Sequence, residues 1–300
     1  MESKKTWLHK IHTALFSASI RQKFEQITIY AAVGGFLTHL GLIFLYKLGL
    51  LPLPELAGEL LTEPISAIYT PFSFILIFEV YELIYYLPRS FTTSIGKQYE
   101  IISLIVIRRI FKDISNLELK DFWSNYYDRM FVGDMLGFLV LFGLIYFFHR
   151  LKKKKPIYAD PPLLNKFIQF KKATSVFLVP VFIGMALYSF IEWAYELQQF
   201  RLGLTQDLSD INKVFYDEFF TTLIMVDVLI LLISLHYTDR YSQLIRNAGF
   251  IISTVLIRLS FSVTGLINII LIVGGVFFGV LILAIYNQYG KLDEDVPKTT

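Results

Sequence analysis

The sequence contains no cysteine, and that absence alone excludes several classes of site. Disulfides, zinc thiolate centres, iron–sulfur clusters and a cysteine nucleophile all need thiol side chains. Charged residues are also scarce, since they make up 18% of the 300 residues and sum to a formal charge of only +3. A net charge this small does not favour a nucleic acid as a partner.

Known catalytic and cofactor patterns are missing as well. The sequence has no phosphate-binding loop, metal-ligand cluster, His-Glu-x-x-His or Gly-x-Ser-x-Gly pattern. His149 and His236 are candidate haem ligands, but histidine at a helix end is more typical of the membrane interface. The acidic group available at the membrane interface for a lipid-modifying enzyme consists of Asp207, Asp210, Asp217 and Glu218, and it has no obvious nucleophile beside it. We therefore expect neither enzymatic activity nor a bound cofactor or metal.

The sequence is rich in apolar side chains. Hydrophobic residues make up 55% of the chain, and the mean hydropathy is +0.55. About 20 mostly apolar residues are enough to cross ~30 Å of hydrocarbon as a helix. The clearest windows are Ile27–Leu50, Ile65–Leu87, Asp134–His149, Thr174–Tyr195, Phe219–Tyr237 and Leu266–Tyr286. Two more windows, Tyr99–Ile114 and Gly249–Val263, contain arginine, so hydropathy alone leaves them as spans or as surface helices.

The N-terminal residues 1–26 do not resemble a cleaved signal peptide. They are basic and amphipathic, with Trp7, Leu8 and Ile11 on one side, and predict an interfacial helix that stays on the cytoplasmic side. Lysine and arginine gather here and in segment 151–172, whereas the segment between the first two windows carries glutamates only. Because basic residues concentrate in cytoplasmic loops, we expect both termini to lie inside. The location predicted is an inner or plasma membrane, crossed several times.

Two parts of the chain resemble each other. Residues 101–108 read Ile-Ile-Ser-Leu-Ile-Val-Ile-Arg, and residues 251–258 read Ile-Ile-Ser-Thr-Val-Leu-Ile-Arg. Glu79 aligns with Asp227, and a Gly-x-x-x-Gly spacing recurs at 133–137 and 275–279. Because the two arginine-containing windows, Tyr99–Ile114 and Gly249–Val263, resemble each other, we expect both to be membrane spans. The repetition predicts an all-α polytopic membrane protein with about eight transmembrane helices, arranged as two parallel four-helix repeats.

The predicted domains follow from this repetition. They are an amphipathic helix (1–26), a first membrane repeat (27–150), a basic linker (151–172), a second repeat (173–290) and a cytoplasmic tail (291–300).

Ionisable residues inside the predicted spans are the candidate functional residues. Each costs ~2.5–3.5 kcal/mol to insert on translocon scales, so it is expected to face the bundle interior and to be paired. Helix depth predicts that Glu79 faces Arg108 and that Asp227 faces Arg258. Glu82 and Arg109 are a second candidate pair in the first repeat only. A further candidate is His39, a lone imidazole in the middle of the first span, which could relay protons.

These charges have two interpretations. A structural one is that each bridge fixes how two helices face each other. A functional one is that they line or gate an ion or proton path, so the protein is an ion channel or ion-coupled transporter. The alternative is a non-transporting membrane partner or sensor subunit of a larger complex. Arginine spacing does not match that of voltage-sensor domains, although voltage sensing through Arg108, Arg109 and Lys112 stays open.

The expected partners follow from the membrane assignment. They are membrane lipids, small inorganic ions, and either a second copy of the chain or a partner membrane subunit. No nucleic acid is expected.

Overall fold

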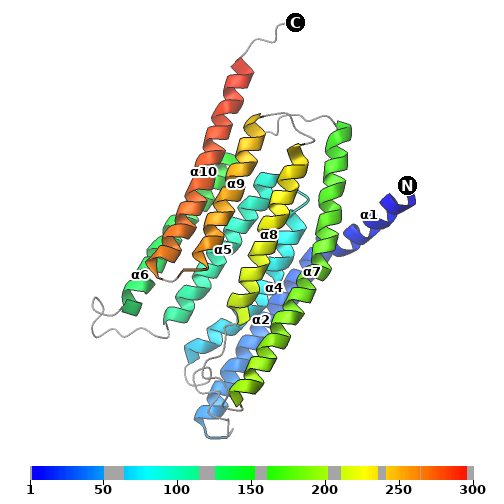
Figure 1. Ribbon diagram of the computed structural model, residues 1–300. Coiled ribbons are helices and arrows are strands. Elements are labelled where there is room, and N and C mark those ends of the chain that lie inside the picture. The colour runs from blue at the N-terminus through cyan, green and yellow to red at the C-terminus, as the bar shows by residue number, and fades with distance from the viewer. Residues whose placement is uncertain are drawn as a thin grey trace. The chain divides into compact units, whose positions relative to one another are not determined.

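The computed structural model describes residues 2–50, 64–114, 126–152, 161–201, 211–235, 241–263 and 265–295, and every regular element in these ranges is helical. The elements in Figure 1 are α1 (Glu2–Phe16), α2 (Ala18–Lys47), the 3-10 helix η2 (Pro64–Ile68), α4 (Tyr69–Tyr86), α5 (Phe91–Ile114), α6 (Tyr126–Lys152), α7 (Pro161–Arg201), α8 (Ile211–Leu235), α9 (Tyr241–Ser260) and α10 (Leu266–Asp295). The predicted all-α class is confirmed.

Five helical segments within the described ranges are long and apolar enough to cross a membrane. They are Lys10–Lys47, Arg129–Lys152, Asn165–Ser189, Glu218–Leu235 and Leu266–Tyr289. Each overlaps one of the six clear windows in the sequence. The remaining clear window, Ile65–Leu87, is divided between η2 and α4, and α4 carries two glutamates. Neither α5 nor α9 is among the five segments, so the predicted count of eight exceeds what length and composition select.

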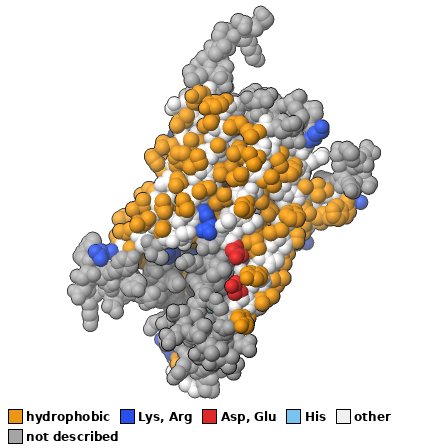
Figure 2. Space-filling view, in the orientation of Figure 1, with side chains coloured by type: hydrophobic (Ala, Val, Ile, Leu, Met, Phe, Trp, Pro, Cys, Tyr) orange, Lys and Arg blue, Asp and Glu red, His pale blue; other side chains and the backbone are white. Residues whose placement is uncertain are grey.

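Apolar side chains cover much of the described surface. Figure 2 shows them spread over most of the described part of one face. Phe142 on α6, Ile191 on α7 and Ile270 on α10 are all more than 60% exposed. Large apolar side chains at this exposure are unfavourable in water and favourable against lipid tails. The surface therefore suits a multi-pass membrane protein.

The N-terminal segment differs from its prediction. Instead of one helix through residue 26, α1 ends at Phe16 and α2 begins at Ala18. Ser17 adopts an extended backbone between them, and its hydroxyl accepts a hydrogen bond from the Ile20 N–H at 3.3 Å. Serine competes with helical backbone bonding and so favours a helix start. Residues 18–26 thus extend the first long apolar helix rather than α1.

The chain divides into two compact units, called the first unit (Met1–Tyr86 and Gly96–Ile145) and the second unit (Leu87–Ile95 and Tyr146–Thr300). In the first unit α2 packs along α4. The ring of Phe24 lies 5.1 Å from that of Tyr81, and Phe16 stacks on Tyr81 at 5.8 Å. The Tyr81 hydroxyl also donates to the Leu15 carbonyl oxygen at 2.9 Å. These contacts fix the end of α1 against α4.

In the second unit α10 packs along α9 after a tight turn. Gly265 has φ of 82°, a conformation that favours glycine. Gly275 allows close approach, because a Cβ there would lie 3.0 Å from the Ser253 carbonyl oxygen. The Ser253 hydroxyl donates to the Gly275 carbonyl oxygen at 2.6 Å. Small residues thus join these two helices, as expected for helices that pack within a membrane.

Several sequence predictions fall on other parts of the chain. Glu55, Glu59, Glu63, Asp207, Asp210 and His236 lie outside the described residues. The basic linker 151–172 is described at its two ends, where 151–152 finish α6 and 161–172 belong to α7. Lys171 is buried within α7 at 3% exposure, so part of the predicted linker is helix interior.

Candidate ion-pathway residues

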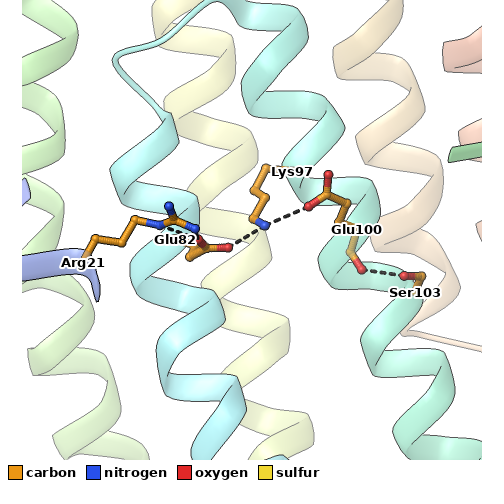
Figure 3. Close-up of polar contacts among 5 residues, drawn as sticks. All are labelled: Arg21, Glu82, Lys97, Glu100 and Ser103. Atoms are coloured by element: carbon orange, nitrogen blue, oxygen red, sulfur yellow. Dashed lines mark hydrogen bonds and ion pairs between the residues drawn. The ribbon is translucent and has the colours of Figure 1, made fainter. Parts of the chain in front are cut away.

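The most connected polar group of the first unit surrounds Glu82 on α4. Its Oε1 lies 2.6 Å from Nη2 of Arg21 on α2, and its Oε2 lies 2.5 Å from Nζ of Lys97 on α5. Figure 3 shows both cations reaching the same carboxylate from opposite sides. The Glu82 side chain is only 5% exposed, so one buried carboxylate holds three helices together.

Two tyrosines lie beside these cations. The Arg21 guanidinium carbon lies 5.5 Å from the ring centre of Tyr85 and 5.8 Å from that of Tyr86. Lys97 Nζ lies 5.5 Å from the Tyr86 ring centre. Cations at this range are attracted to aromatic rings, which partly replaces lost hydration. The tyrosines therefore lower the cost of holding Arg21 and Lys97 at the edge of an apolar bundle.

Lys97 also bridges Glu82 to a second carboxylate. Its Nζ donates to Glu100 Oε2 at 2.8 Å, and the Ser103 hydroxyl donates to the Glu100 carbonyl oxygen at 2.6 Å (Figure 3). Lys97 lies outside the candidate spans. Burial lowers the pKa of its ammonium group, but the hydrogen bonds and charges of Glu100 and Glu82 together raise it above the usual value. Lys97 is therefore a fixed cation at neutral pH.

Glu79 lies one helical turn from Glu82 on the same face of α4. It is buried, at 7% exposure, and the charges of Arg108 and Lys97 on α5 act on it. Within the described part of the chain, Glu79 makes no hydrogen bond and no ion pair shorter than 4 Å. Glu79 thus contrasts with Glu82, because nearby cations attract it electrostatically but none of the described residues forms a direct ion pair with it.

Arg109 pairs with Asp134 on α6 and not with Glu82, so that sequence prediction is wrong. Its Nε and Nη2 donate to the two Asp134 carboxylate oxygens at 2.5 and 2.7 Å. Each Glu82 carboxylate oxygen already has a cation, Arg21 on one and Lys97 on the other, whereas both Asp134 oxygens accept hydrogen bonds from Arg109. The bidentate pair joins α5 to α6.

His39 has a hydroxyl partner. Its Nδ1 lies 2.6 Å from the Thr70 Oγ1 of α4, and the ring is half-buried. This contact explains why an imidazole is tolerated in the middle of a long apolar helix, because it supplies the hydrogen bond that a buried polar group requires. A proton-relay role for His39 stays a prediction.

The second unit places its candidate charges differently. Asp227 on α8 is buried at 1% exposure, and the charge of Lys171 on α7 acts on it. The Lys171 ammonium donates to the Arg89 carbonyl oxygen. Arg258 on α9 donates from Nε to the Thr221 hydroxyl of α8 at 2.8 Å. Arg258 therefore contacts α8 through Thr221, and Lys171 is a charged group near Asp227.

Sequence reasoning missed four residues that the structure brings to these sites: Arg21, Lys97, Asp134 and Lys171. Lys97 and Glu100 are three apart on one helix, a spacing that could have indicated their pair. Arg21 and Lys171 belong to the basic stretches 1–26 and 151–172, and nothing in a single sequence marks which members of such a stretch turn inward.

Comparisons of this chain with family models, with curated proteins and with solved structures found no significant match.

Proposed function

We propose that this protein is an integral membrane ion channel or ion-coupled transporter, built from about eight spans in two parallel four-helix repeats. Ions would pass along α4 and α5 of the first unit. The predicted orientation puts the Glu82 network at the cytoplasmic ends of the first three spans and Asp134 toward the opposite side. The second repeat, with Asp227 and Arg258, would carry fewer charges on the same plan.

Glu79 is the observation that carries the proposal. A carboxylate buried in a helix bundle is costly unless it is paired, and structural acids in this unit are paired directly, as Glu82 and Asp134 show. Glu79 is buried among charges without a direct ion pair to any described residue. A group in this state gains free energy by binding an ion, which is what a transport site requires.

The polar residues around Glu79 extend along the helix axis. Lys97 and Arg108 are eleven residues apart on α5, which corresponds to about three turns and about 16 Å. They therefore lie on one face of the helix. Glu79 and Glu82 on α4 are near this face, since Lys97 contacts Glu82 and both cations act on Glu79. Together these groups form a polar strip about 16 Å long, which begins at Lys97 just outside the predicted span Tyr99–Ile114 and runs into it.

Ion flux into liposomes tests the proposal. Purified protein is reconstituted, and gradients of potassium, sodium, protons and chloride are imposed in turn at several voltages. We expect flux of a selected ion, and we expect Glu79→Gln to reduce it to the level of empty liposomes. Absence of flux for every ion would overturn the proposal and favour a partner or sensor subunit instead.

Two controls separate transport from folding. Glu192→Gln removes the same charge from an exposed position on α7 and should leave flux unchanged. The double variant Glu79→Gln with Arg108→Met removes opposite charges together, so it should restore detergent stability if Glu79→Gln alone lowers it. A stable double variant without flux supports the pathway role of Glu79. A stable double variant with full flux contradicts it.

A further inference from the structure

We infer that the ion this protein carries is the proton, and that the Glu79 carboxylate is the group that binds and releases it. The inference rests on the proposed function and names its substrate.

The charges facing Glu79 disfavour a metal cation. Arg108 and Lys97 act on Glu79 from α5, and Glu82 acts on it from its own helix. Arg21 on α2 pairs with Glu82 and so offsets the charge of that carboxylate. A metal ion at Glu79 would have to approach within about 2–2.6 Å of its oxygens and share the site with two cations. It would be repelled at the position where it must lose its water.

A proton can bind at Glu79 without the ligands that a metal cation needs. It forms a covalent O–H bond with one Glu79 oxygen, needs no shell of further ligands, and leaves the side chain neutral. A neutral carboxylic acid is tolerated in an apolar interior far better than the carboxylate. The proton comes from hydronium on one side, which becomes water. The O–H bond breaks when a water on the other side accepts the proton, and the carboxylate is restored.

Glu82 explains why one acid rather than both takes this role. Arg21 and Lys97 hold the Glu82 carboxylate at 2.6 and 2.5 Å, so protonation would break two ion pairs. Protonation of Glu79 breaks no direct ion pair with a described residue. The neighbouring carboxylates are thus divided into one that fixes the helices and one that exchanges a proton.

Proton flux measured with a pH-sensitive dye tests the inference. Proteoliposomes carry a pH gradient, and valinomycin with potassium sets the voltage. We expect proton flux that Glu79→Gln abolishes, that Glu79→Asp retains in part, and that Glu192→Gln leaves unchanged. Flux of sodium, potassium or chloride without proton flux would overturn this inference while leaving the proposed function intact. Absence of flux for all ions would overturn both.

Chemical labelling provides a second test that does not need a folded variant. Dicyclohexylcarbodiimide reacts with protonated carboxyl groups in apolar surroundings, and mass spectrometry of the unsubstituted protein locates the product. We expect labelling at Glu79, faster at lower pH, with parallel loss of proton flux. Labelling at other carboxyl groups but not at Glu79, or labelling of Glu79 without loss of flux, would overturn the inference.

Discussion

The two units join their helices with different chemistry. In the first unit, ion pairs connect α2, α4 and α5 at Glu82, and connect α5 and α6 at Asp134. In the second unit, α9 and α10 meet at Gly275 and Ser253, and Phe182 on α7 lies 4.6 Å from Phe219 on α8. Charge holds helices apart by the length of long side chains, whereas glycine and serine let backbones touch. The first unit therefore holds charged side chains between its helices at these contacts.

Aligned positions of the predicted repeats show the same divergence. Glu82 corresponds to Ile230, which is buried at 1% exposure, and Arg109 corresponds to Leu259, which is 51% exposed. Ser103 donates within its own helix, while its counterpart Ser253 donates to the next helix. At Glu82 and Arg109 the first repeat carries a charge, and at the two aligned positions the second carries an apolar side chain.

The largest effect should come from Glu82→Gln. The substitution removes the anion between Arg21 and Lys97, and breaking a buried ion pair costs about 3–5 kcal/mol. The matched change Ile230→Val in the second unit should cost about 1 kcal/mol, since it removes one methyl group. Thermal unfolding in detergent measures both. A smaller loss for Glu82→Gln than for Ile230→Val would end the contrast between the units.

Asp134→Asn should have the next largest effect. It weakens both hydrogen bonds from Arg109, and hydrogen bonds to charged groups contribute about 1.5–3 kcal/mol. Replacing both residues by leucine makes the first unit resemble the second at this position. The double variant should recover most of the stability, because apolar packing can replace a buried pair. Equal instability of the single and double variants would show that the charges matter beyond their pairing.

Gly275→Ala should destabilise the contact between α9 and α10 by about 1–2 kcal/mol. The added Cβ would lie 2.9 Å from a side-chain carbon of Ile257 and 3.0 Å from the Ser253 carbonyl oxygen. Gly274 is the control, because a Cβ at that position meets nothing within 4 Å. Melting curves of the two variants should therefore differ, with Gly274→Ala close to the parent. Coincident curves would contradict the close approach.

The smallest effect should come from Ser253→Ala, at about 0.6 kcal/mol, the average for hydrogen bonds between membrane helices. Its counterpart Ser103→Ala should change stability less, because Ser103 donates to Glu100 on its own helix. Denaturant titration of both variants in the same detergent gives the comparison. A larger loss for Ser103→Ala would reverse the assignment of hydroxyl roles between the units.

Particular residues show how far the sequence could predict the site. Glu79, Arg108 and Asp227 were identified because a charge inside an apolar window stands out in hydropathy alone, and all three are buried. The partners were harder to predict. Counting residues from a span end gives the depth of each charge in the membrane, and this depth suggests that Glu79 and Arg108 are partners. It does not give the rotation of each helix about its axis. Hydropathy and depth therefore suggest Glu82 as the partner of Arg109, although Asp134 on α6 faces it.

The sequence by itself determined the helical class, the five long apolar segments and the residues that carry charge into them. These follow from composition and from periodic patterns within one segment, which need no knowledge of neighbours. Tertiary structure decided which carboxylate is held by ion pairs, because ion pairing depends on distances between helices far apart in sequence. Arg21 and Glu82 are 61 residues apart, and only packing brings them into contact.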